Sequence, residues 1–171
     1  MNADSEAGSQ LDKSYLTICL GYLGLIPFLI PLWQMIVAVS QGLGVDSASL
    51  FGLYAPYVFI TYSAVILSFL AGILWSKGRF NTQQKASKAA IVFSNMMAIS
   101  AWTSLIIINY SQMLTMFAVA LLLGGFGSLL LAERALNIDS DDAKYWRMRL
   151  VLTMIVIAAH SLLLVFLIRA F

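Results

Sequence analysis

Five long apolar stretches alternate with short polar ones along the chain. They cover approximately residues 14–39, 52–75, 89–109, 113–132 and 150–168. An α-helix needs ~20 mainly apolar residues to cross the hydrocarbon core of a bilayer, and each stretch meets or approaches that length. The pattern therefore predicts an all-α membrane protein in which five transmembrane helices form one bundle.

The composition supports this class of protein. Hydrophobic residues make up 61% of the chain and charged residues 11%, whereas soluble domains are roughly 45–50% apolar. No break in composition divides residues 14–171, so we expect a single transmembrane domain. Residues 1–13 carry three acidic residues and one lysine without apolar periodicity, which predicts a mobile tail.

A cleaved signal peptide is an alternative interpretation of the first stretch, because Ala38-Val39-Ser40 resembles a small-residue cleavage site. The length of the stretch, the acidic tail before it and the internal Pro27 and Pro31 favour a retained helix. Each proline removes a backbone donor and crowds the carbonyl four residues earlier, so the helix is predicted to bend. We interpret the bend as a packing kink. A ligand or ion site is the alternative, since freed carbonyls need polar partners in lipid.

Basic residues concentrate on one predicted side of the membrane. If the N-terminus is cytoplasmic, nine lysines and arginines lie inside, in the tail and in the polar stretches 76–88 and 133–149, and Arg169 alone lies outside. The positive-inside rule therefore predicts a cytoplasmic N-terminus and a C-terminus in the periplasm or outside. These charges face the lipid bilayer, and no basic stripe with interleaved aromatic residues indicates nucleic acid as a partner.

Small residues recur at every fourth position in two of the stretches. The second stretch carries Ala64, Ser68 and Gly72, and the fourth carries Gly124 and Ser128. A spacing of four places such residues on one helix face, where small side chains let another backbone approach closely. We therefore expect the second and fourth helices to pack against each other through these residues.

His160 is the one ionisable residue predicted well inside a span, about ten residues from the cytoplasmic end of the fifth helix. A neutral imidazole bonded between helices is favoured over a proton relay or a haem ligand, because the spans contain no second histidine and no carboxylate to join it. Ser68 and Asn95 lie at similar predicted depth and could hydrogen-bond to each other between helices. We expect no metal ion and no cofactor.

The main charged cluster lies between the fourth and fifth spans. It comprises Glu133, Arg134, Arg147 and Arg149, and we expect it at the cytoplasmic surface, where it caps helices and contacts headgroups. Docking of an anionic lipid or a partner protein is the alternative. The sequence contains no paired carboxylates in a span, no nucleophile with a base and no phosphate-binding glycine loop, so we expect no enzymatic activity.

Four blocks of sequence carry a resemblance to a known family. They are LGYLGLIPF at 20–28, YSAVILSFLAGILW at 62–75, AW at 101–102 and YWRMRLVLT at 145–153. In order and spacing they resemble the domain-of-unknown-function 3429 family, which includes transmembrane protein 69 of animals. The resemblance implies a multi-pass protein of the bacterial inner membrane and supplies no functional residues. The chain departs from it at Leu74, where relatives often carry His or Arg.

These observations favour two functions. Small packing faces, short loops and few ionisable groups favour a non-enzymatic accessory or assembly subunit of a membrane complex, with other membrane proteins or a second copy as partners. The alternative is a small transporter or a protein that binds a lipid or another hydrophobic ligand. The proline bend, His160 and Asn95 favour that alternative, although no internal twofold repeat, common in transporters, is detectable.

Fusions of alkaline phosphatase test the predicted orientation. The enzyme requires disulfides, which form outside the cytoplasm and not within it. A fusion after Phe171 is therefore expected to be active, and one in the polar stretch near Thr82 is expected to be inactive. The reverse pattern of activities would overturn the predicted topology.

Overall fold

Five helical spans, each long and apolar enough to cross a membrane, lie in the part of the chain that the computed structural model describes. That part comprises residues 15–81, 84–108, 110–135 and 143–170. The prediction of an all-α, five-span membrane protein is therefore confirmed. The predicted tail at 1–13 lies outside the described residues.

The first span consists of helical residues 15–23, a turn at 24–25 and α2 (Ile26–Ser40). A short connection follows, with the 3-10 helix η1 (Val45–Ser47) and the antiparallel strands β1 (Ser49–Leu50) and β2 (Leu53–Tyr54). The remaining spans are α3 (Ala55–Phe80), α4 (Gln84–Ile107), α5 (Gln112–Ala135) and α6 (Ala143–Arg169).

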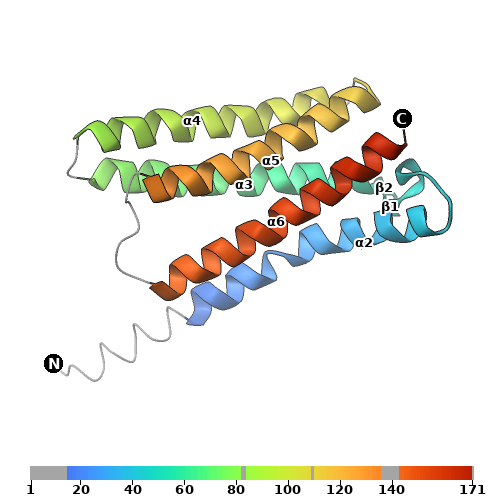
Figure 1. Cartoon of the computed structure of the whole chain (residues 1–171), viewed down its shortest axis with the longest axis horizontal. Coiled ribbons are helices and arrows are strands. Elements are labelled where there is room, and N and C mark those ends of the chain that lie inside the picture. Colours follow the sequence, from blue (N-terminus) through green and yellow to red (C-terminus); the bar gives the residue numbers. More distant parts are fainter. Residues whose placement is uncertain (1–14, 82–83, 109, 136–142, 171) are drawn as a thin grey trace.

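Helix α3 is the central element of the bundle. It contacts α2, α4 and α5, while α6 contacts α5 and α2. Figure 1 shows α4 and α5 along one edge of the bundle and α2 along the other, with α6 crossing between them. The first and last described residues lie at opposite ends of the bundle, as an odd number of spans requires.

Three helices continue further into the polar stretches than the apolar pattern predicts, and one of them, α4, begins at Gln84 instead of about residue 89. Helix α3 ends at Phe80 instead of about residue 75, so Lys77 and Arg79 lie in its last turns. Helix α6 begins at Ala143 instead of about residue 150. Lysine and arginine stems can lie along apolar surface while their charges stay in water, and cations stabilise a helix C-terminus. Hydropathy therefore marks the apolar core of a span and not its helical ends.

The predicted bend in the first span is present just before Pro27. The helix breaks at Gly24 and Leu25, and Pro27 then occupies the first turn of α2, where its missing N–H is tolerated. The freed Gly24 carbonyl accepts a hydrogen bond of 2.9 Å from the hydroxyl of Tyr62 on α3. Pro31 lies inside α2. The bend is thus joined to the neighbouring helix by a partly buried polar contact.

The predicted packing through Gly72 and Gly124 is wrong. A methyl group placed on either glycine would meet no atom within 4 Å, so both face open space. Helix α5 instead receives the Leu67 side chain of α3 at Gly125, the next residue along. Helices α3 and α5 do contact each other, but a spacing of four residues does not identify which of several neighbouring glycines faces the partner.

The other predicted packing residues have mixed outcomes. Ala64 is buried in the core, while Ser68 is only half-buried. Ser128 hydrogen-bonds to the Met97 sulfur at 3.4 Å, so it packs on α4 and not on α3. Helices α3 and α4 come close together at Gly78, where an added methyl would sit 2.8 Å from the Ala90 side chain.

Glycine-to-alanine substitutions on α3 test this packing. Gly78→Ala would force α3 away from Ala90, because a methyl attached directly to a helix backbone cannot rotate aside, and overpacking costs about 1–3 kcal/mol. Gly72→Ala, the matched control on the same helix, fills open space and is expected to stabilise by up to ~1 kcal/mol through helix propensity. Thermal unfolding in detergent measures both, and equal effects would contradict the assignment.

Candidate functional site

A cavity of about 490 Å³ lies between the first span, α3 and α6. Residues of the bend form one wall, and Phe126 of α5 closes the inner end together with Phe28 of α2. Gly24 and Leu25, where the helix of the first span is interrupted, are among the residues that line the cavity. Its volume lies within the range of roughly 300–1,000 Å³ typical of small-molecule sites in proteins.

The lining is mainly apolar with a few polar groups. The apolar residues are Leu20, Leu25, Phe28, Ile66, Phe69, Leu70, Ile73, Phe126, Met148, Leu152 and Val156, together with Gly21 and Gly24. The polar side chains are Thr17, Tyr62, Tyr145, Arg149 and Thr153. This combination of a long apolar surface with a few polar groups is the usual composition of a site that orients a hydrophobic ligand.

The mouth of the cavity is on the outer surface of the bundle. Leu20 of the first span is 57% exposed and Phe69 of α3 is 63% exposed, and both line the cavity. Their exposed faces lie at the depth of the apolar spans, where the surroundings are lipid chains. A molecule dissolved in the bilayer therefore has a lateral route into the cavity.

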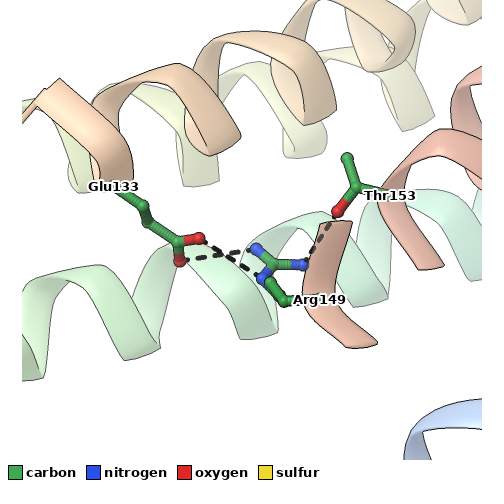
Figure 2. Close-up of polar contacts among 3 residues, drawn as sticks. All are labelled: Glu133, Arg149 and Thr153. Atoms are coloured by element: carbon green, nitrogen blue, oxygen red, sulfur yellow. Dashed lines mark hydrogen bonds and ion pairs between the residues drawn. The ribbon is translucent and has the colours of Figure 1, made fainter. Parts of the chain in front are cut away.

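Arg149 on α6 forms a buried ion pair with Glu133 on α5. Its Nε atom donates to Glu133 Oε2 at 3.3 Å, and its Nη2 atom donates to Oε1 at 3.4 Å. Its Nη1 atom donates to Thr153 Oγ1 at 3.4 Å, one helical turn further along α6. Figure 2 shows the guanidinium group between the carboxylate and the threonine, with α3 behind them.

Both charged side chains are almost completely inaccessible, with 8% of Arg149 and 2% of Glu133 exposed. Burying a charge is expensive unless it is paired and hydrogen-bonded. The two parallel bonds between guanidinium and carboxylate meet that requirement in a bidentate arrangement. The pair therefore holds the end of α5 against the beginning of α6.

These contacts use only some of the hydrogen-bond donors of Arg149. A guanidinium group carries five N–H donors, and Glu133 and Thr153 together accept three hydrogen bonds from it. One N–H on each terminal nitrogen thus has no partner among the described residues. Arg149 and Thr153 belong to the lining of the cavity, whereas Glu133 does not.

The prediction of a charged cluster at the cytoplasmic surface is wrong for half of its members. Arg134 and Arg147 are exposed, but Glu133 and Arg149 are buried inside the bundle. The sequence does contain a signal for the pairing of Glu133 with Arg149. Glu133 follows the fourth apolar stretch without a linker, and Arg149 with Thr153 has the spacing of one helix face, so opposite charges stand at the adjoining ends of consecutive spans.

His160 is fully buried on α6, but its hydrogen bond differs from the predicted one. The nearest acceptor is the Val156 carbonyl of the same helix, 2.8 Å from Nδ1. A carbonyl only accepts, so Nδ1 carries the proton. The imidazole Nε2 atom has no partner in the described structure. Rings of Phe28, Phe59 and Phe126 surround the imidazole at centroid distances of 6.1, 4.7 and 5.3 Å.

The remaining predicted polar residues do not join the site. Asn95 is exposed and donates to the Ile91 carbonyl of its own helix at 2.8 Å, so the predicted bond to Ser68 is not formed. Pro27 and Pro31 do not line the cavity, although Gly24, Leu25 and Phe28 next to them do. Leu74, where the family resemblance led to the expectation of a polar residue, is fully buried in the core.

Breaking the ion pair tests its role in stability. Arg149→Met leaves Glu133 buried without a counter-charge, and such losses cost about 3–5 kcal/mol. The double variant Glu133→Leu/Arg149→Met removes both charges and is expected to recover most of that loss. Arg147→Met, an exposed control on the same helix, should change stability by less than about 0.5 kcal/mol. Thermal unfolding in detergent is the measurement, and additive losses in the double variant would contradict the pair.

Comparison with known proteins identifies a family. A family model described as a protein of unknown function, DUF3429, matches residues 15–165. This range includes all the residues that line the cavity and both members of the ion pair. No curated protein and no solved structure gives a significant match. The family match covers far more than half of the chain, and this multi-pass membrane protein therefore belongs to the DUF3429 family.

Proposed function

We propose that the protein binds one small hydrophobic molecule in the cavity between the first span, α3 and α6, and that it does so in the bacterial inner membrane. The observation that carries this proposal is a cavity of about 490 Å³ with an apolar lining and a buried arginine. Of the two functions that the sequence left open, this one corresponds to the hydrophobic-ligand binder.

The cavity has the features that such a ligand needs. Its apolar walls favour transfer of a hydrophobic body, and Leu20 and Phe69 lie at a mouth that faces lipid chains. Arg149 and Thr153 supply a polar contact within the same space. An amphiphile can therefore enter sideways from the bilayer and be held by its polar group. A molecule without an apolar body would leave most of the apolar side chains of the lining without a hydrophobic contact.

The side chains favour binding over catalysis. Thr153 and Arg149 are hydrogen-bonded to each other, and the Glu133 carboxylate is engaged by the guanidinium. Among the described residues that line the cavity, there is no histidine or carboxylate that could act as a base on a bound molecule. We therefore propose a non-enzymatic role, in which the protein stores, presents or senses its ligand.

The inner-membrane location and the orientation rest on charge. The end of α3, the beginning of α4 and the adjoining ends of α5 and α6 lie at the same end of the bundle (Figure 1). Most of the basic residues of the chain belong to these segments. The positive-inside rule assigns this end to the cytoplasm. The accessory role expected from the sequence stays a prediction, because no contact among the described residues bears on a partner protein.

Native mass spectrometry of protein extracted gently from its own membranes tests the binding function. Wild-type protein is expected to retain one small molecule per chain after loosely held lipids are removed. Ile66→Trp places a large ring into the cavity and should abolish retention. Val65→Trp, the adjacent residue, is 61% exposed and does not line the cavity, so it should retain the molecule.

Two outcomes of the same measurement would contradict the proposal. One is wild-type protein that carries no small molecule, and the other is equal retention by the Ile66→Trp and Val65→Trp variants. Reproducible masses of a larger assembly would support the accessory role instead, and the identity of the added subunit would name its partner.

A further inference from the structure

We infer that the cavity selects a ligand with a neutral hydrogen-bond acceptor, such as the carbonyl oxygen of an ester, ketone or quinone, and discriminates against a ligand with an anionic headgroup. This inference rests on the proposed binding function and names the chemical class of its ligand. It follows from two observations at Arg149. Two of its N–H donors have no partner among the described residues, and its charge is balanced by Glu133.

The polar groups next to the guanidinium offer hydrogens and few acceptors. Arg149 has two N–H donors without a partner among the described residues. The Thr153 hydroxyl accepts from Arg149, and its own hydrogen has no partner among the described residues. Both side chains line the cavity. A ligand that presents an oxygen acceptor satisfies these donors, whereas a plain hydrocarbon leaves them unpaired in a dry site, where unpaired donors are costly.

The charge of the arginine is already balanced. Glu133 holds the guanidinium through two hydrogen bonds, and among the described residues that line the cavity there is no carboxylate and no basic side chain besides Arg149. A second anion bound to the same guanidinium would bring two negative charges together in a buried site, which is unfavourable for both. A neutral carbonyl oxygen accepts the same hydrogen bonds without that repulsion. The buried Glu133 is therefore the group that sets the preference for a neutral ligand.

Three probes with similar alkyl chains separate the possibilities. Dodecane has no acceptor, methyl dodecanoate has a neutral carbonyl, and dodecanesulfonate carries a charge that does not titrate near neutral pH. Their affinities are measured by native mass spectrometry on delipidated protein in detergent. Wild-type protein is expected to bind methyl dodecanoate about tenfold more tightly than either of the other probes, since a hydrogen bond from a charged donor supplies a factor of that order.

Variants of the polar groups identify the source of the preference. Thr153→Val removes one donor with little change in shape, and the ratio of ester to dodecane affinity should fall about threefold. Glu133→Leu/Arg149→Met removes the guanidinium with its counter-charge, and the ratio should fall to about one. Glu133→Gln keeps Arg149 but removes the negative charge, so the sulfonate should then bind more tightly than the ester.

The outcomes separate this inference from the proposed function. Dodecane bound by wild type and excluded by Ile66→Trp, without preference for the ester, would overturn the inference and leave the binding function standing. A sulfonate that binds wild type as tightly as the ester would also overturn it. Failure of every probe to bind wild type would overturn both. If Glu133→Gln proves too unstable to purify, the Thr153→Val and double variants still decide the question.

Discussion

The buried ion pair between Glu133 and Arg149 is the constraint on which the rest of this structure depends. Neither charge can remain inside the bundle without the other, so the end of α5 and the beginning of α6 must meet at one register. That contact orients the guanidinium group of Arg149, a residue that lines the cavity. A single interaction thus fixes the packing of two helices and the polar chemistry of the candidate site.

The apolar part of the site depends on a second local feature, the bend before Pro27. Residues at and beside this bend belong to the lining of the cavity. The chain turns at Gly24, and Tyr62 accommodates the freed carbonyl with a hydrogen bond of 2.9 Å. The sequence analysis considered a kink and a ligand site as alternatives. The bend is a kink in the backbone of the first span, and residues beside it also form a wall of the cavity.

Much of the fold could be predicted from the sequence, but little of the site could. The five spans follow from the length of apolar runs, because the thickness of a bilayer dictates that length. Which face of a helix meets a neighbour depends on tertiary packing, so Gly125 and Gly78 could not be distinguished from Gly72 and Gly124. Glu133 and Arg149 were assigned to the surface because polarity was read along the chain, whereas their burial results from pairing across two helices. His160 was correctly expected inside, but its place among phenylalanine rings needed three other helices.

An experimental density map of the protein, extracted with its own lipids and bound to a rigid antibody fragment, tests the central claim most directly. The account predicts elongated density in the cavity between Phe28 and Arg149 that ends within hydrogen-bond distance of the guanidinium group, with Glu133 still paired on the opposite side. A collapsed cavity, or an Arg149 side chain turned away from Glu133 toward the headgroups, would contradict it.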